Sequence, residues 1–237
     1  ESLEKYPVGG LIYFAQNIQS ENQLKEMLSN TASYSLFPLF FGVDEEGGKV
    51  ARVADALKLD KTLPMGEIGA AGDTQAAYDA YQNIGGYLSA YGFNVDFAPV
   101  ADVLTNVDNT VIGNRAFSSD AGVAAQMVSS AVTGLQETGV SACLKHFPGH
   151  GDTAGDSHTG AAQTNRTKEE MEAEEFLPFQ SGIEAGVDMI MVGHITAPNL
   201  TDGDSLPASI SEKIITGVLR NELGYQGIII TLSLIHI

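Results

Sequence analysis

The sequence has a single cysteine and no long apolar run. Because Cys143 has no partner, the chain can form neither a disulfide framework nor a CxxC metal pair. Cys143 lies in the apolar run 140–144, which predicts a buried, inert thiol. No apolar run approaches the roughly 20 residues that a membrane-spanning helix needs. We therefore expect no membrane span in this chain, and the lone thiol is not expected to be a nucleophile.

Basic residues are also scarce. There are 12 lysines and arginines against 30 aspartates and glutamates, which gives a formal net charge of −18. Nucleic acids and anionic membranes both require a basic face, so neither is expected as a partner. The acidic residues are scattered along the chain, which is typical of a solvated surface. A neutral substrate such as a sugar is compatible with this charge.

The pattern of apolar residues predicts an α/β protein. The 237 residues, 43% of them hydrophobic, suit one large domain. Short apolar runs alternate with amphipathic segments, and continuous runs of this length are typical of strands buried on both faces of a parallel sheet. The expected strands are residues 10–14, 39–44, 94–100, 142–147, 189–194 and 227–231.

Helix boundaries between these runs are marked by capping residues and glycines. Capping boxes are predicted at Ser20 and Thr167, and Ser211 is predicted to cap a helix that runs to about Leu223. Two long helices are expected at about 74–91 and 121–138. A glycine lies at four helix-to-strand junctions, which indicates repeated αβ units with parallel strands: Gly92, Gly139, Gly186 and Gly224.

Polar residues at the strand ends favour a closed barrel over an open doubly wound sheet. Asp44, Asp102, Lys145, His146 and His194 lie at or just beyond the carboxyl ends of different expected strands. A barrel brings such groups to one rim, whereas an open sheet gathers them only at its switch point. No GxGxxG follows a strand. We predict a (β/α)8 TIM-type barrel truncated at both ends, with about six strands present.

One segment concentrates groups that can bind a polar ligand and move a proton. It reads Lys145-His146-Phe147-Pro148-Gly149-His150-Gly151-Asp152-Thr153 and is followed by Asp156-Ser157-His158. Histidine gives and takes protons near neutrality, and a nearby carboxylate fixes its tautomer. Asp156 and His158 are therefore candidates for a proton-transfer pair. His158 could instead be an ordinary surface histidine, and Lys145 a rim lysine paired with an acid.

A metal site is a further alternative for this segment. His146-x3-His150-x-Asp152 supplies residue types that bind first-row metals. The Pro148-Gly149 step between the histidines excludes the i, i+4 spacing of a zinc-binding helix. We expect no metal and no cofactor.

Other candidate ligand-binding residues follow other strands. Asp44, nearest its strand, is the better candidate in the acidic run 44–46, and the alternative for Glu45 or Glu46 is a simply solvated carboxylate. Arg52 and Arg115 carry planar donor groups that suit carboxylate and carbonyl oxygens. For each arginine, a structural salt bridge is the alternative to substrate contact.

The chain resembles family 3 glycoside hydrolases of the β-N-acetylglucosaminidase type. The resemblance rests first on the Lys145-to-Thr153 segment with Asp156-Ser157-His158, and the latter step is specific to the N-acetylglucosaminidase branch. It runs along the whole chain through further matches in the family's order: Gly9-Gly10-Leu11-Ile12-Tyr13-Phe14, Gly42-Val43-Asp44-Glu45-Glu46-Gly47-Gly48, Phe97-Ala98-Pro99-Val100-Ala101-Asp102, Gly113-Asn114-Arg115-Ala116-Phe117 and Gly224-Tyr225-Gln226-Gly227.

The resemblance implies a (β/α)8 barrel that hydrolyses terminal β-linked N-acetylglucosamine with retention. His158 then matches the acid/base and Asp156 its partner. The implied sugar-binding residues are Asp44, Arg115, Lys145 and His146, with Arg52 as a weaker member. A histidine donor departs from the common two-carboxylate scheme of glycosidases but is chemically sound. The implied partner is a small carbohydrate, a GlcNAc-containing glycan or peptidoglycan fragment, and the oligomeric state stays open.

The sequence departs from the family where the nucleophile is expected. The family carries a Thr-Asp step after the final strand, whereas this chain has Thr231-Leu232. We therefore interpret residues 1–231 as a partial barrel domain and 232–237 as a non-family tail, and expect this chain to be inactive. Alternatives are a broader β-hexosidase such as a β-glucosidase, or a non-catalytic sugar-binding remnant. With a start at Glu1 inside an expected helix, the compartment stays open, with an extracellular or cell-surface location favoured over a cytoplasmic one.

Overall fold

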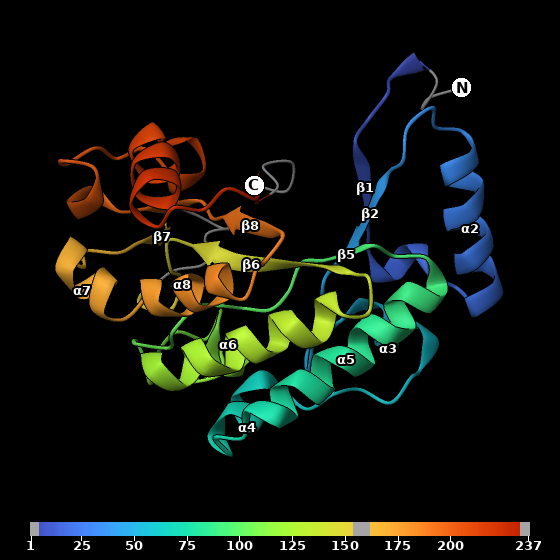
Figure 1. Ribbon diagram of the computed structural model, residues 1–237, viewed down its shortest axis with the longest axis horizontal. Helices are drawn as coiled ribbons and strands as arrows, with labels where there is room; N and C mark the ends of the chain where they lie inside the picture. Colours follow the sequence, from blue (N-terminus) through green and yellow to red (C-terminus); the bar gives the residue numbers. More distant parts are fainter. Residues whose placement is uncertain (1–4, 154–161, 233–237) are drawn as a thin grey trace.

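A six-stranded parallel sheet organises the protein. The computed structural model describes residues 5–153 and 162–232. The strands lie side by side in chain order, and each pairs in parallel with the next. Figure 1 shows the sheet curving from β1 and β2 on the right to β6 and β8 at the centre. The strands are β1 (Gly10–Tyr13), β2 (Phe40–Val43), β5 (Val95–Asp96), β6 (Ser141–Phe147), β8 (Met189–Val192) and β10 (Ile228–Thr231).

All six expected strands are confirmed, most of them somewhat shorter than the apolar runs. The expected barrel is confirmed only in its coarser form, as a curled parallel half-barrel with β1 and β10 at its two edges. Sequential parallel strands require a crossover between neighbours, and each crossover here contains at least one helix. Two short pairs accompany the main sheet: antiparallel β3 (Glu45–Gly47) with β4 (Val50–Ala51), and parallel β7 (Ala162–Gln163) with β9 (Ile195–Thr196).

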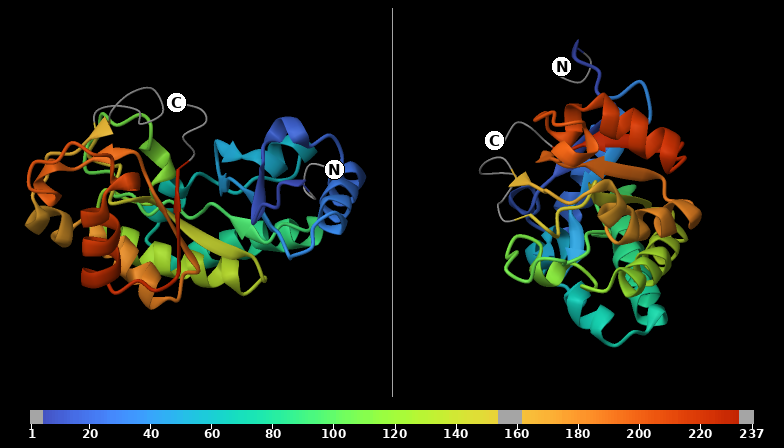
Figure 2. Two further views of the ribbon diagram at one scale, coloured as in Figure 1. Left: turned by 90° about the horizontal axis from the view of Figure 1, so that it is seen from above. Right: turned by 90° about the vertical axis from the view of Figure 1, so that its left-hand side faces the viewer.

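The crossover helices lie outside the curve of the sheet, as the two further views in Figure 2 show. The longest are α5 (Thr74–Tyr91) and α6 (Ala121–Gln136), which confirm the two expected long helices. The other helices are α2 (Glu21–Ser33), α3 (Arg52–Leu57), α4 (Met65–Ala70), α7 (Lys168–Ala173), α8 (Phe176–Glu184) and the π-helix η5 (Lys213–Glu222), with short 3-10 turns η1 (Ala15–Asn17), η2 (Gly113–Arg115), η3 (Pro198–Leu200) and η4 (Ala208–Ile210). None of the described helices is both long and apolar enough to span a bilayer.

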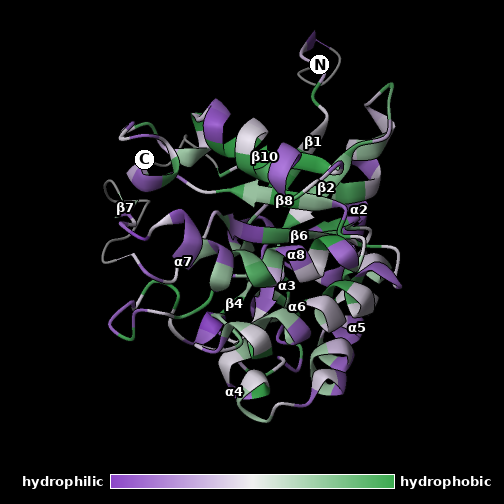
Figure 3. Ribbon diagram, turned by 60° about the vertical axis from the view of Figure 1, so that its left-hand side comes forward, coloured by the Kyte–Doolittle hydropathy of each residue, from purple (hydrophilic) through white to green (hydrophobic). Residues whose placement is uncertain are grey.

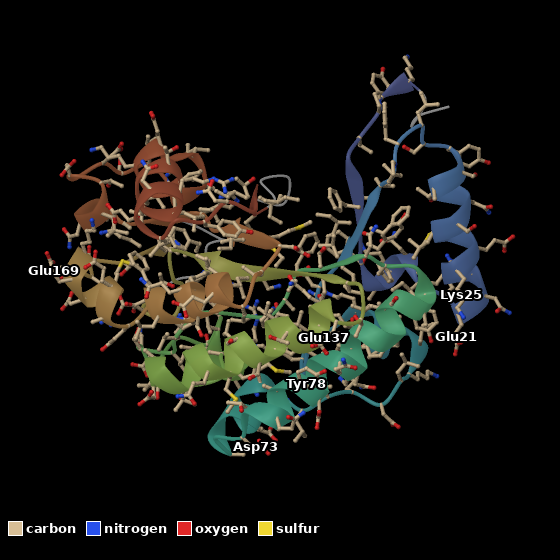
Figure 4. The ribbon with its side chains drawn as sticks, viewed as in Figure 1. Glu21, Lys25, Asp73, Tyr78, Glu137 and Glu169 are labelled. Atoms are coloured by element: carbon tan, nitrogen blue, oxygen red, sulfur yellow. The ribbon has the colours of Figure 1, made fainter. Side chains whose placement is uncertain are left out.

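Local signals at the helix ends are confirmed at most positions. Ser20 accepts from the Gln23 amide, and Thr167 forms a full capping box with Glu170. Gly92 ends α5 with a φ of 103°, which favours glycine. Figure 4 labels Asp73, which caps the start of α5, and also Tyr78 of α5, whose hydroxyl donates to Glu137 after α6.

The predicted cap position at Ser211 is confirmed, but the contact comes from its backbone. Its amide donates to Ala208 O within the preceding 3-10 turn, and η5 begins two residues later at Lys213 without a side-chain cap. The Ser211 carbonyl does accept the Ile215 amide hydrogen at 2.9 Å. A backbone contact therefore takes the place of the expected hydroxyl cap.

Two apolar clusters lie on opposite faces of the sheet. The larger one fills the space between the sheet and the outer helices, and Figure 3 shows the hydrophobic colouring of strands such as β2 and β8. The smaller cluster lies on the concave face and comprises Val95, Phe97, Cys143, Met189 and Met191. Cys143 is fully buried and burial raises the pKa of its thiol, so the expectation of a buried thiol is confirmed.

A hollow of about 310 Å³ opens on the concave face. Its lining comes from residues of β1, β2, β5, β8 and β10 and is predominantly apolar. It is the interior of the half-barrel, and the chemistry-bearing groups lie elsewhere, at the carboxyl ends of the strands. Side chains alternate along a strand, so the lumen-facing set that begins with Cys143 continues to Lys145 at the rim.

Candidate functional site

The site is centred on Lys145, near the carboxyl end of β6. Its Nζ lies 2.6 Å from Asp44 Oδ1 and 2.6 Å from Glu46 Oε1. Asp44 directly follows β2, and Glu46 lies on β3, so two residues of the same β2-to-β5 crossover contact one ammonium group. The Lys145 and Glu46 side chains are buried, whereas Asp44 is 25% exposed and faces the open side. An ammonium group has three donors, and the described residues use two of them.

Arg115 completes a chain of charges. Its Nε and Nη2 donate to the two carboxylate oxygens of Glu46, each at 2.8 Å, and its Nη1 donates to the Val111 carbonyl. Such two-pronged pairs fix orientation as well as charge. The 3-10 turn η2 brings Arg115 to this place from the crossover after β5. The observed contact of Arg115 is therefore a structural salt bridge, the alternative to substrate contact in the sequence analysis.

The charges in this cluster stabilise one another. Burial alone would raise the pKa of Glu46, but the neighbouring Lys145 and Arg115 outweigh it and hold that pKa well below its usual range. Burial also opposes the charge on Lys145, and the carboxylates of Asp44 and Glu46 outweigh it, so the pKa of Lys145 is raised. Glu46, Lys145 and Arg115 are therefore charged at neutral pH.

His146 lies beside this cluster and is held by Asp102. Its Nδ1 is 2.7 Å from Asp102 Oδ2, and Oδ1 of the same carboxylate accepts the amide hydrogens of His146 and His150. Burial lowers the pKa of His146 to about 4, although Asp102 acts in the opposite direction. Burial would raise the pKa of Asp102, but its contacts with His146 and His150 bring it below normal. The pair is therefore a carboxylate with a neutral imidazole whose Nε2 is an acceptor.

The three residues of the metal alternative turn to separate partners. His146 Nδ1 binds Asp102, His150 Nδ1 lies 2.6 Å from Thr153 Oγ1, and Asp152 accepts from Thr164 at 2.9 Å. Within residues 5–153 and 162–232, no group of three or more possible metal ligands lies together. The arrangement suits polar contacts to a neutral ligand.

The remaining predicted site residues have different outcomes. Arg52 begins α3, where its amide donates to the Asp44 carbonyl at 3.4 Å. Its Nε is buried without a partner, and its guanidinium forms no ion pair with Asp44 or Glu46, within residues 5–153 and 162–232. His194 follows β8 at the same rim, with Nδ1 bonded to Ser209 Oγ at 2.7 Å. Asp156 and His158 lie outside the described residues.

Four buried carboxyls at or beside the site were missed by sequence reasoning. Glu46 is buried at the centre of the ion cluster rather than solvated, and Glu45 is buried as well, so the solvated alternative is wrong for both. Asp102 was noted at a strand end but was not chosen as a site residue. Its signal was available, because Asp102 is the only polar residue in the apolar stretch 97–103. Asp96, on β5, had no signal beyond being an acid inside an apolar run.

A parallel half-barrel with charged groups at its carboxyl rim belongs to the class of α/β-barrel enzymes. The family description "Glycosyl hydrolase family 3 N terminal domain" matches residues 1–235, and the chain belongs to that family. It therefore represents the N-terminal part of a glycoside hydrolase.

Known relatives agree with this assignment. The chain is 40% identical to β-hexosaminidase A of Pseudoalteromonas piscicida, over 98% of this chain and 42% of that protein. A solved β-N-acetylglucosaminidase from Paenibacillus sp. str. FPU-7 has a TM-score of 0.94 at 37% identity, over 99% of this chain and 45% of that one. NagZ from Neisseria gonorrhoeae, in complex with N-trifluoroacetyl-D-glucosamine, has a TM-score of 0.88 at 31% identity, over 96% and 68%. The chain thus spans less than half the length of the first two relatives.

Proposed function

We propose that this chain is the barrel portion of a retaining β-N-acetylglucosaminidase and binds a terminal β-linked N-acetylglucosamine at its carboxyl rim. The observation that carries the proposal is the placement of Lys145 between Asp44 and Glu46, with neutral His146 alongside. This arrangement offers an ammonium donor, carboxylate acceptors and an imidazole acceptor. Sugar hydroxyls both donate and accept, so they match such a set.

The chemical step would need two further groups. By the family resemblance, His158 is the acid/base, which would protonate the leaving oxygen and later activate water. Asp156 is its partner in the same assignment. Retention also needs a nucleophilic carboxylate, expected directly after the last strand. Leu232 occupies this position, with its amide donating to Val192 O at 3.0 Å and its side chain packed against the concave-face cluster. Leucine cannot form a glycosyl ester, so we propose that this chain binds the sugar without turning it over.

The names of the relatives support the sugar over other ligands. They are β-hexosaminidases and a β-N-acetylglucosaminidase, and one NagZ structure holds a glucosamine derivative. For the longer parent we propose peptidoglycan fragments, chitin oligomers or glycan ends as substrates, and an extracellular or cell-surface location. A β-glucosidase-like specificity is the alternative within enzymes. A non-catalytic sugar-binding role is favoured specifically by Leu232.

The proposal is tested by restoring the missing carboxylate. The unmutated chain should bind N-acetylglucosamine in an NMR titration and release no sugar from an aryl β-N-acetylglucosaminide. The Leu232→Asp variant should gain turnover of this substrate. Adding His158→Ala to that variant should abolish the turnover. Faster cleavage of the matching aryl β-glucoside by Leu232→Asp would favour the broader β-hexosidase. Turnover by the parent, or an absence of sugar binding, would contradict the proposal.

A further inference from the structure

The segment that carries Asp44 and Glu46 is held from behind by a buried aspartate. Asp96 Oδ1 accepts the Glu45 amide hydrogen at 2.9 Å, and the Asp96 side chain is fully buried. Val43 is the last residue of β2, and Asp96 is its register partner on β5. The Glu45 amide lies beyond this last paired position, so the Asp96 side chain accepts from an amide that the ladder no longer reaches. A buried amide without an acceptor is costly, which makes this contact a structural requirement.

The position of Glu45 decides where its neighbours point. Side chains alternate along a strand, so Glu45 turns away from the site while Asp44 and Glu46 turn toward Lys145. The Glu45 carboxylate accepts from the Val53 and Ala54 amides at 2.7 and 3.0 Å and from the Tyr87 hydroxyl at 2.7 Å. These contacts anchor the side chain, and the Asp96 contact anchors the backbone of the same residue.

A second residue of the same segment makes an equivalent contact far from the rim. Asn94 Oδ1 accepts the Phe41 amide hydrogen at 2.7 Å, and its Nδ2 donates to Leu39 O at 2.9 Å. Asn94 thus ties the β5 segment to the start of β2, as Asp96 ties it to the residues after the end of β2. Only the Asp96 contact adjoins the residues that hold Lys145. Asn94 is therefore a matched control position for Asp96.

We propose that Asp96 is a positioning residue for the sugar site, which fixes the 44–46 segment so that Asp44 and Glu46 hold Lys145 from two sides. The consequence for ligand affinity rests on the proposed sugar-binding function. Asp96 touches no substrate in this assignment and acts only through Glu45. Burial raises the pKa of Asp96 well above its ordinary value, and asparagine keeps the shape of the side chain and its accepting oxygen.

The test compares Asp96→Ala, Asp96→Asn and Asn94→Ala in the full chain, first without any ligand. Trace acetylation with acetic anhydride, followed by mass spectrometry, reports how well Lys145 is protected, with exposed Lys168 as the internal reference. Lys145 should be acetylated several-fold faster in Asp96→Ala and stay protected in the other two variants. Asp96→Ser, whose hydroxyl is too short to reach the Glu45 amide, replaces the alanine variant if that variant does not fold.

The second measurement is the affinity for N-acetylglucosamine by NMR titration. Asp96→Ala should bind roughly tenfold more weakly, which corresponds to the loss of one ordinary hydrogen bond, and the other two variants should bind like the parent. Equal Lys145 labelling in Asp96→Ala and Asn94→Ala, or an Asp96→Asn variant as impaired as Asp96→Ala, would overturn the assignment. If the parent binds no sugar, the proposed function is wrong, and the labelling still decides the role of Asp96.

Discussion

The buried carboxylate of Glu46 offers the sharpest test of how the site is held together. It accepts two hydrogen bonds from Arg115 at 2.8 Å and lies 2.6 Å from Lys145 Nζ, with the Glu46 side chain only 2% exposed. The change Glu46→Gln keeps the shape but removes the charge and places an NH2 group where an oxygen accepted. One of the two cations would then face a donor.

The cost follows from the burial of the partners. Removing one member of a buried ion pair typically costs about 3 to 5 kcal/mol, because the partner charge stays buried and uncompensated. Lys145 would retain Asp44, so the lower half of that range is expected. For a domain of this size the loss corresponds to a fall in Tm of roughly 6 to 16 °C. Urea titration and thermal melts of parent and variant measure both quantities.

Two controls separate this effect from the general cost of removing a charge. Glu222→Gln breaks an exposed pair with Lys168 and should cost less than about 1 kcal/mol. Lys145→Met combined with Glu46→Gln removes one charge of each sign, so the double variant should be more stable than the sum of the single costs implies, by about 1 kcal/mol or more. Strictly additive costs, or a Glu46→Gln variant as stable as Glu222→Gln, would refute the reasoning.

The remaining predictions concern two buried titrating groups with opposite effects on stability. The pKa of His146 in the folded protein is about 4, below its ordinary value. Its stabilising contribution is therefore complete above about pH 6.5, and about 2 to 3 kcal/mol of stability is lost as the pH falls toward 4. His146→Asn should flatten that part of the profile, and an unchanged acid limb would contradict the low pKa. Glu175 differs in sign: burial, against the opposing charge of Arg166, raises its pKa to about 7, so it costs about 1 to 2 kcal/mol as the pH rises from about 4.5 to 7. Glu175→Gln should remove this cost in urea titrations between about pH 4 and 8, and a neutral-pH stability equal to the parent's would count against it.

The sequence predicted the scaffold because local patterns encode it. Continuous apolar runs located all six strands, four of them after a junction glycine, and Gly92 ends α5 where its apolar periodicity ends. These signals act within a few residues and need no tertiary information. Ser211 shows their limit, because it lies directly before the helix as expected but contacts it through its backbone carbonyl.

The electrostatic details of the site escaped prediction for the opposite reason. Glu46 and Arg115 are 69 residues apart, and Asp44 and Lys145 are 101 apart, so neither pairing leaves a local pattern. Asp44 and Lys145 were found as candidates because each ends a strand. Glu46 looked like a surface acid because β3, the short strand that buries it, contains no apolar residue. Its burial is offset by partners from distant crossovers rather than by its own sequence neighbours.

The cluster also shows why the large negative charge of the chain says little about its ligand. Around the candidate sugar site, the carboxylates of Asp44 and Glu46 contact the cations of Lys145 and Arg115, and the Asp102 carboxylate contacts neutral His146. The local charge is therefore close to balanced, whereas the net charge of −18 belongs to scattered residues. Buried pairs are screened by salt far less than exposed ones. Binding of an uncharged sugar at this rim depends on donors and acceptors that the ion pairs orient in advance, and the field of the protein surface contributes little to it.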